Sequence, residues 1–482
     1  MYNRNFSRAA GALKHPQAVS NLLFQLWLET VARAPRAAAL IDASSGRRWS
    51  RAALAAGAGE WAAAFGHKLG LGISLRRRVA FSVPNGAEWF HGFLGLLAAG
   101  AVPVPIDPGE PDEAQAAAAR AAGCSHLWRG DRLVALGTPF PAPRISRAEC
   151  LVKMTSASTG APRGLPATSE QMVADGTQIC RSMGIGGDDA NLAAIPLGYS
   201  YGLGNLVIPL LVQGTRSICL SSTLPHAVAA DCRRFRPTVF PAVPPLLAAL
   251  AASAVPASAL ASLRLVISAG SPIEAVVAAD FAHRFGRRIH SFYGTSETGG
   301  ITFDRTGEAT LAGRSVGTPL EGVRLEPGRT GRFTVVSAAV LGPGRFRPAD
   351  RGRLGAGGEL TLLGRTGRMV KVAGRRLNLA EIERALRQIP GVRGAFAHLV
   401  PGTTPVLAAA VASELSPAEL RRLLGPRLAP WKVPTRLVLL AEIPLTVRGK
   451  TDARQLRQLL AAPRTATSIS TFSAARQMSA PR

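Results

Sequence analysis

Short apolar runs alternate with amphipathic stretches along the first two thirds of the chain. Between residues 77 and 108, a buried-strand pattern (RRVAFSVPNG) is followed by helical spacing (EWFHGFLGLLAAG) and a second apolar run (AVPVPIDP). The same alternation returns between residues 217 and 294. Strands that alternate with helices indicate βαβ units, so the pattern predicts an α/β fold with mostly parallel sheets flanked by helices.

The two ends of this region have different patterns. Residues 21–66 are predicted to form two amphipathic helices around a turn at SSGRRWS. After about residue 310, short alternating segments separated by glycines predict hairpins and a small β-barrel-like section, followed by a helix at AEIERALRQI. We therefore expect a large N-terminal domain (1–365), a small α+β C-terminal domain (366–462) and a disordered tail (463–482).

The chain is strongly basic. Its 482 residues carry a formal net charge of +27, mostly from arginine. One explanation is an acidic partner, such as a nucleic acid, an anionic lipid, a nucleotide or an acidic carrier protein. The other is codon bias in a GC-rich genome, because alanine, arginine and glycine are abundant while lysine is scarce.

Cysteine usage and the apolar runs bear on the compartment. The five cysteines form no CxxC pair, which argues against a zinc site or a disulfide framework and favours a reducing cytosol. The longest apolar run (92–106) is short for a membrane span and contains three glycines and two prolines. The N-terminus lacks a signal-peptide core. We expect a cytoplasmic protein without a membrane span.

The stretch MTSASTGAPRG (154–164) crowds hydroxyl groups and glycines together with one arginine. Backbone amides, hydroxyls and a cation suit a phosphate. The stretch lacks the GxxxxGK[ST] pattern of the common nucleotide loop. A polar turn without a ligand is therefore an alternative explanation.

Three further segments carry groups suited to a nucleotide. In YGTSE, at a predicted strand end, Tyr293 can stack on a base and Glu297 can hold Mg²⁺. Asp350 can accept both hydroxyls of a ribose, with Arg365 nearby. Lys450, in a Gly-Lys pair before a predicted helix, is a point charge suited to a developing negative oxygen. Each segment alone is equally compatible with a solvated turn.

The order and spacing of these segments resemble the adenylate-forming superfamily of acyl- and aryl-CoA synthetases, carrier-protein ligases and related adenylation domains. The resemblance covers about residues 25–460. It is carried by VPNGAEWFHGFLGLLAAGAVPVPIDP, MTSASTGAPRG, IPLGYSYGLGNLVIPLL, SFYGTSETGG, FRPADRGRL, GRTGRMVKVAGRRLNLAEIE and PLTVRGKTD, in that order.

The resemblance implies a reaction in two steps. Mg-ATP activates a carboxylic acid as an acyl-adenylate with release of pyrophosphate, and a thiol of CoA or of a separate acidic acyl-carrier protein then takes the acyl group. It implies ATP contacts from Thr155, Ser156, Ser158, Thr159, Gly160, Arg163, Ala269, Gly270, Ser271, Tyr293, Gly294, Asp350 and Arg365. It further implies Lys450, Thr295 and Glu297 as catalytic residues, Glu297 as the metal ligand, Tyr199, Tyr201 and Gly202 in the acyl pocket, Lys371 and Gly374 at the thiol tunnel, and Gly367 as the hinge.

Five features depart from the pattern of the family. Arg163 stands where lysine is usual, Ala157 replaces a glycine, and Pro348-Ala349 replaces Thr-Gly. Gly367 occupies a hinge that often carries Asp or Lys, and Tyr199 replaces a frequent histidine. The cation at 163 is kept but changes from a point charge to a planar fork, and glycine at the hinge still permits rotation.

The acid and the alternatives to a ligase follow from the same residues. Amino-acid-activating relatives keep an Asp in the pocket motif, and GYSYG (198–202) has none, so we expect an aryl or medium-length acyl acid. One alternative is a nucleotide-binding relative without ligase turnover, which the departures favour. A nucleic-acid binder is another, but the chain lacks a recognisable module or basic-aromatic stripe.

Overall fold

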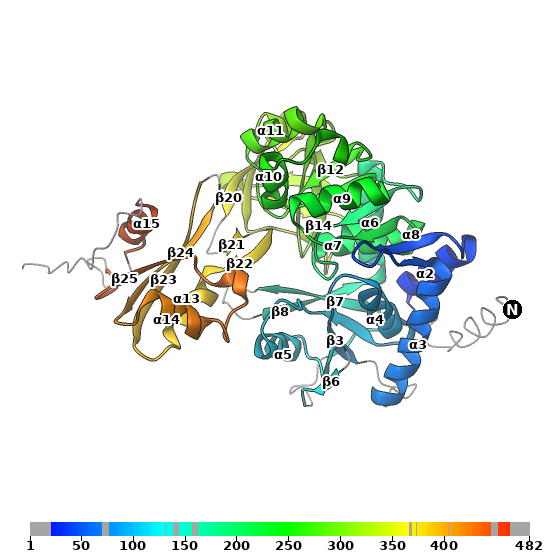
Figure 1. Cartoon of the computed structure of the whole chain (residues 1–482), viewed down its shortest axis with the longest axis horizontal. Helices are drawn as coiled ribbons and strands as arrows, with labels where there is room; N and C mark the ends of the chain where they lie inside the picture. The colour runs from blue at the N-terminus through cyan, green and yellow to red at the C-terminus, as the bar shows by residue number, and fades with distance from the viewer. Residues whose placement is uncertain are drawn as a thin grey trace, which may run out of the picture.

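The large sheet at the centre of the molecule holds nine strands (Figure 1). In chain order they are β1 (Ala38–Asp42), β2 (Arg48–Ser50), β9 (Ala190–Ala193), β10 (Arg216–Cys219), β11 (Val239–Ala242), β12 (Leu265–Ser268), β13 (Ile289–Thr295), β14 (Gly299–Phe303) and β15 (Thr318–Pro319). Their order across the sheet is β15-β14-β13-β12-β11-β9-β10-β1-β2. The pairs from β13 to β1 are parallel, and β2, β14 and β15 pair antiparallel at the edges. The parallel strands therefore end at one edge, where open α/β sheets bind ligands.

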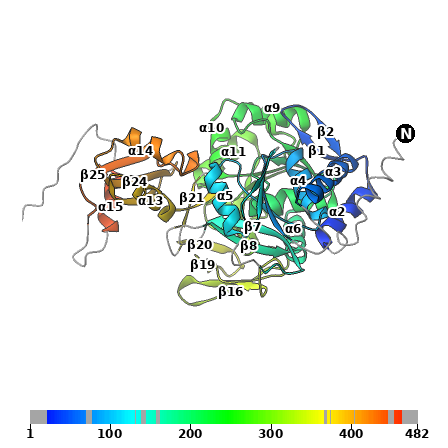
Figure 2. The ribbon, with the colours of Figure 1, turned by 90° about the horizontal axis from the view of Figure 1, so that it is seen from below.

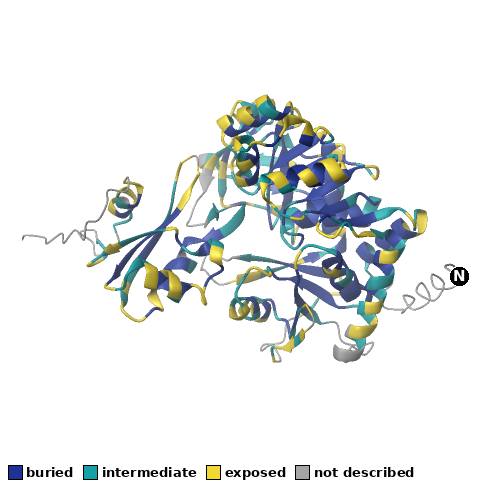
Figure 3. Cartoon of the chain, viewed as in Figure 1, coloured by how far each residue is buried: buried dark blue, intermediate teal, exposed yellow. Residues whose placement is uncertain are grey.

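Helices cover both faces of this sheet (Figure 2). Leu40 packs with side chains of one group of helices, whereas its neighbour Ile41 packs with those of another group. Side chains of successive strand residues point to opposite faces, so both faces are buried, as Figure 3 shows. The first group contains α2 (Leu22–Arg33), α4 (Ala87–Ala98) and α8 (Ile208–Gln213), and the second contains α9 (Pro225–Phe235), α10 (Pro244–Ala252) and α11 (Ala275–Phe285).

A smaller sheet and a long hairpin lie next to the large sheet. The smaller sheet has the order β4-β3-β5-β6, in which β3, β4 and β5 are parallel. Its elements are β3 (Arg78–Ser82), β4 (Val102–Pro105), β5 (His126–Arg129) and β6 (Arg132–Ala135), with helices α3 (Arg51–Leu69) and α5 (Asp112–Ala121). The hairpin of β7 (Glu149–Ser156) and β8 (Pro162–Thr168) leads into α6 (Ser169–Met183).

The chain continues through small antiparallel sheets, as the glycine-separated segments predict. These are β16 (Arg324–Pro327), β17 (Phe333–Val336) and β18 (Arg345–Phe346), the pair β19 (Asp350–Leu354) and β20 (Leu360–Arg365), and the pair β21 (Met369–Val372) and β22 (Arg375–Asn378). Within the described part of the chain, no strand pairing closes them into a barrel. The short helix α12 (Glu308–Leu311) precedes them.

The last section of the chain is a three-stranded sheet with helices, on the left of Figure 1. Its elements are α13 (Leu379–Arg387), β23 (Val392–Val400), β24 (Val406–Ser413), α14 (Pro417–Leu424), β25 (Arg436–Leu440) and α15 (Ala453–Ala461). This α+β section has a hydrophobic core of its own, formed by side chains of α13, β23, β24 and α14. The boundary that we predict at 365/366 falls between β20 and β21, and the division into domains stays a prediction.

The prediction for residues 21–66 is wrong in one respect. The two helices exist as α2 and α3, but β1 and β2 lie between them where only a turn was expected. Leu40 of β1 pairs with Ser217 of β10, so β1 gains its hydrogen bonds from a partner far along the chain. The residues AALI of β1 form a short continuous apolar run, and periodicity alone does not distinguish such a run from a buried helical segment.

The computed structural model describes most of the chain, and some predicted features fall outside its range. Among its helices, none has the length and the apolar character needed to cross a bilayer. The hinge Gly367, the catalytic candidate Lys450 and the predicted tail lie outside the described residues, which are 21–69, 77–130, 132–137, 144–156, 162–365, 369–372, 374–402, 404–444 and 452–462.

Candidate active site

A cavity of about 710 Å³ lies where the parallel strands end. Residues that directly follow β9, β11 and β12 line it, together with the last residues of β13. The opposite wall comes from the strand pair β21–β22 and from the segment around Trp431. The cavity therefore lies between the large central sheet and the C-terminal α+β section. From the predicted site it contains Thr155, Tyr199, Tyr201, Gly202, Ala269, Gly270, Gly294, Thr295, Lys371 and Gly374.

Tyr293, predicted to stack on adenine, lies next to Asp350, which is predicted to hold the ribose. The Tyr293 hydroxyl donates a hydrogen bond of 2.8 Å to Oδ2 of Asp350. Tyr293 is buried at the end of β13, and Asp350 begins β19. Asp350 pairs in register with Arg365 on β20. A carboxylate held in this way can accept from a diol, and the assignments of Tyr293 to adenine and of Asp350 and Arg365 to the ribose stay predictions.

The end of β13 and the residues that follow it present hydroxyls and a carboxylate. Thr295 is 4% exposed, and its hydroxyl shares a 3.0 Å hydrogen bond with that of Thr298. Glu297 is partly exposed, and its Oε2 lies 3.8 Å from Nη1 of Arg376 on β22. Arg376 also donates to the Ser296 hydroxyl at 3.5 Å. The C-terminal section thus supplies a cation to the carboxylate predicted to bind the metal.

Glu297 could bind magnesium together with the phosphates of a bound nucleotide. Within the described residues, no three acidic, histidine or cysteine side chains gather to form a complete metal site. Mg²⁺ is commonly held by one or two carboxylates together with substrate phosphates and water. Glu297 is a partly exposed carboxylate next to the cavity-lining Ser296, which is compatible with that mode, and it stays the predicted ligand.

Two glycines bring backbone segments into close contact at the predicted adenine site. Gly270 has φ +97°, and a Cβ there would lie 3.0 Å from the carbonyl oxygen of Gly374. Gly374 has φ +79°, and a Cβ there would lie 2.3 Å from Cγ1 of Val243. Both positions therefore exclude a side chain. Ser271 lies beside Gly270 and is half-buried.

The phosphate loop is described only at its two ends. Thr155 lines the cavity at the end of β7 and pairs in register with Arg163 on β8. Arg163 is exposed, and the Ser156 backbone pairs with Pro162. The remaining predicted contacts, Ser158, Thr159 and Gly160, lie outside the described residues, together with Ala157. The loop thus connects two strands whose ends lie at the cavity, and its role stays a prediction.

Two tyrosines form the predicted acyl pocket. The Tyr199 hydroxyl donates to the Asp107 carboxylate. Burial, followed by the charge of Asp107, raises the pKa of Tyr199 well above its usual value, so this hydroxyl stays protonated. The Tyr201 ring lies 5.8 Å from the Phe292 ring, and its hydroxyl donates to the Ile267 carbonyl at 3.3 Å. These side chains give the cavity an aromatic wall.

A buried lysine that sequence reasoning missed links the two sides of the cavity. Lys432 lies 2.5 Å from Oε1 of Glu110 and 2.9 Å from Oε1 of Glu381. Burial alone would lower the pKa of Lys432, but the charges and hydrogen bonds of Glu381 and Glu110 raise it. Nearby, Arg375 lies 3.4 Å from Asp107 and stacks over Trp431. The positions are far apart in sequence, so no local pattern could reveal them.

A second missed residue is Asp175, which also lines the cavity. It lies on the buried face of α6 with Met172 and Ile179. Those spacings of three and four residues place an acidic side chain within an apolar helical stripe, which is a signal that the sequence does contain.

The C-terminal section is oriented with its β21–β22 pair at the cavity. Lys371 and Gly374 from this pair line the cavity. The helix α15, which follows Lys450 along the chain, packs against β23 and β24. Figure 1 shows α15 on the far side of the C-terminal sheet from the centre of the molecule.

Comparisons with known proteins give consistent matches. A family model described as AMP-binding enzyme matches residues 27–139 and 128–326, together more than half of the chain. A feruloyl-CoA synthase of an Amycolatopsis species is 27% identical over 441 residues, covering 80% of this chain and 89% of the relative. Among solved structures, an amide bond synthetase from Marinactinospora thermotolerans has a TM-score of 0.78 at 24% identity, with coverage of 90% and 99%. An o-succinylbenzoate-CoA synthetase from Bacillus subtilis has a TM-score of 0.77 at 20% identity, with coverage of 90% and 98%.

Proposed function

The chain belongs to the AMP-binding enzyme family, and we propose that it joins an aryl or medium-length carboxylic acid to a thiol through an acyl-adenylate. The observation that carries this proposal is the single cavity described above. It combines the Tyr201–Phe292 wall with Thr295 and, from the C-terminal section, with Lys371 and Gly374. The acid, the nucleotide and the thiol would thus meet at one cavity.

The first step is the activation of the acid by ATP, which supplies a leaving group that a carboxylate lacks. Tyr293 would stack on adenine, Asp350 would hold the ribose, and Thr295 would donate to the acid and the α-phosphate. Glu297 would hold Mg²⁺, which screens phosphate charge when it is bound. Lys450 would neutralise charge that develops at phosphorus. The protein contributes mainly position and fixed electrostatic groups.

The second step is the transfer to a thiol. We infer that the described arrangement serves this step, because Lys371 and Gly374 face the cavity. Gly374 leaves room for a narrow pantetheine chain where a side chain would contact Val243. In this arrangement the guanidinium of Arg376 would supply the positive charge next to Glu297. A rotation about Gly367 would exchange Lys371 for Lys450.

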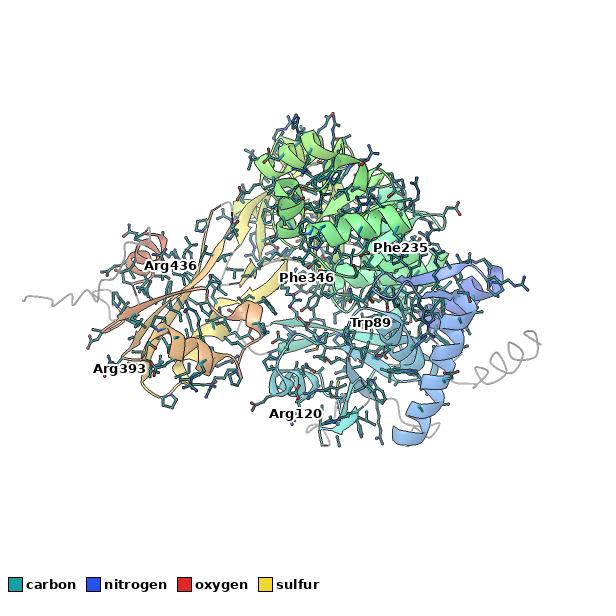
Figure 4. All side chains as sticks on the ribbon, in the orientation of Figure 1. Trp89, Arg120, Phe235, Phe346, Arg393 and Arg436 are labelled. Carbon is teal, nitrogen blue, oxygen red and sulfur yellow. The ribbon has the colours of Figure 1, made fainter. Side chains whose placement is uncertain are left out.

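Aryl acids are supported by the aromatic wall of the cavity. The ring centroids of Tyr201 and Phe292 lie 5.8 Å apart with the planes tilted by 43°, and further aromatic contacts with this pair favour a planar guest. The feruloyl-CoA synthase among the relatives takes its name from an aryl acid. Exposed arginines such as Arg120 and Arg393, at the periphery in Figure 4, suit either CoA phosphates or an acidic carrier protein.

The test is a panel of carboxylic acids in an ATP–pyrophosphate exchange assay. At least one aryl acid should support exchange, and Lys450→Ala should nearly abolish it. CoA, a phosphopantetheinylated carrier protein and a simple amine are then offered separately to the preformed adenylate. ATP binding without exchange across the panel would support the relative without turnover, and transfer to the amine alone would contradict the thiol acceptor.

A further inference from the structure

A carboxyl group on α6 reaches the cavity at a point that the proposed steps do not use. Asp175 is 1% exposed and lines the cavity. Its Oδ1 accepts a 2.8 Å hydrogen bond from the backbone N–H of Gly300. Its Oδ2 is buried, and no donor within the described part of the chain reaches it. Buried acceptors without a partner are rare in folded proteins, so this oxygen points to a donor that enters with a ligand.

Two glycines make room for this carboxyl group. A Cβ at Gly299 would lie 2.3 Å from Oδ1 of Asp175, and a Cβ at Gly204 would lie 3.1 Å from Oδ2. Gly299 has φ +69° and pairs in register with Thr295. The carboxyl group therefore lies beside the strand pair that carries the proposed contact to the acid. Its position suits contact with the organic part of the same molecule.

The charge next to Asp175 limits the kind of donor. Lys153 on β7 is 1% exposed, and its charge acts directly on Asp175. Burial lowers the pKa of Lys153 and raises that of Asp175, and each charge opposes the shift of the other. A buried carboxylate and a buried ammonium already balance. An ammonium on the substrate would leave an excess of buried positive charge, whereas a neutral hydroxyl would not.

We propose that Asp175 accepts a hydrogen bond from a neutral hydroxyl group on the acid substrate, so that the enzyme selects hydroxylated aryl acids over their methyl analogues. The proposal rests on the proposed function, because it takes this cavity as the acid pocket. A site that hydrogen-bonds a substrate hydroxyl rejects the analogue without it, since the analogue leaves the protein acceptor unpaired. Asp175 is thus a specificity-determining residue that touches the substrate.

The test uses a charge-balanced variant and a matched control. Asp175→Leu combined with Lys153→Met removes both buried charges and leaves no side-chain acceptor at this point of the pocket. Asp231→Asn is the control, because Asp231 is also buried on a helix and accepts from the Ser221 hydroxyl at 2.8 Å, but does not line the cavity. Circular dichroism and thermal melting check that each protein folds.

Binding is measured by calorimetry with benzoates and cinnamates that carry a hydroxyl, a methyl or an aminomethyl group at each ring position. For at least one position, the wild type should bind the hydroxy acid about 10- to 100-fold more tightly than the methyl acid. That ratio should fall to near unity in the double variant and persist in Asp231→Asn. The aminomethyl acid should bind no better than the methyl acid.

Several results would overturn the proposal. They are equal binding of every hydroxy and methyl pair by the wild type, a preference that survives in the folded double variant, or a preference for the aminomethyl acid. If the double variant does not fold, the comparison of hydroxy and methyl acids in the wild type decides the question by itself. Selective binding of hydroxy acids without any ATP–pyrophosphate exchange would instead contradict the proposed function and leave the role of Asp175 standing.

Discussion

Replacing Glu110 by methionine should slow thiol transfer selectively. Glu110 and Glu381 both contact the ammonium of Lys432, at 2.5 and 2.9 Å. Glu381 lies in the same C-terminal section as Lys432, whereas Glu110 lies on the other side of the cavity. Of the two contacts that Lys432 makes, only the one with Glu110 therefore joins the two sides of the cavity, alongside the Arg375–Asp107 and Arg376–Glu297 pairs.

The magnitude follows from the nature of that contact. Both side chains are largely buried, at 11% and 15% exposure, so solvent screens the pair weakly. A hydrogen bond to a charged group contributes about 1.5–3 kcal/mol. Glu110→Met removes that contribution from the described arrangement only, and Lys432 keeps its ion pair with Glu381. The population of the described arrangement should fall by about 10- to 150-fold relative to others.

Two rates test this reasoning. The acyl-adenylate is formed first, and single-turnover transfer to the thiol is then measured after rapid mixing. Transfer should slow in Glu110→Met while ATP–pyrophosphate exchange stays close to wild type. Glu381→Met is the matched control: it should reduce thermal stability without a selective loss of transfer. Equal losses in the two variants, or unchanged transfer in Glu110→Met, would refute the idea that Lys432 fixes the arrangement.

Three further predictions concern single positions. Gly374→Ala should slow thiol transfer and spare pyrophosphate exchange, because its Cβ would lie 2.3 Å from Val243 Cγ1 at φ +79°; equal effects on both rates would contradict this. Arg163→Lys should keep ATP use, and Arg163→Ala should raise the KM for ATP about tenfold, as expected for a lost charged contact; unchanged ATP kinetics would show that Arg163 contacts no phosphate. Burial would raise the pKa of Asp189, but the hydrogen bond from Arg264 lowers it below 3.8. That carboxylate therefore adds stability above about pH 4 which is lost as the pH falls through its folded-state pKa, and Asp189→Asn should flatten the fall of Tm between about pH 5 and pH 2.

Features that depend on local sequence were predictable. In YGTSE, Tyr293 and Thr295 lie in the last three residues of β13 and Glu297 follows it, so their place at a strand end follows from the apolar run before them. The hairpins after residue 310 follow in the same way from alternation and glycine spacing. In both cases the residues that determine the structure are neighbours in the chain.

Features that depend on distant partners were not predictable. Strand β1 needs β10, and Lys432 needs Glu110 and Glu381, which lie in different segments of the chain. Asp175 differs, because its place in the apolar stripe of α6 was visible, but only the cavity shows that its Oδ2 lacks a partner. Periodicity shows that a residue is buried, whereas the folded structure shows what lies beside it.

The pairing of β1 with β10 has a consequence for the order in which the chain can fold during synthesis. Helix α2, just before β1, is held by the Thr30 hydroxyl, which donates to the Val212 carbonyl 182 positions later. At about 5–20 residues per second, a ribosome needs roughly 9–36 s to supply that partner. During that time, the backbone edge of β1 at Leu40 and Ile41 lacks its parallel partner β10. Nascent chains of this protein therefore present an open strand edge to chaperones until β10 has emerged.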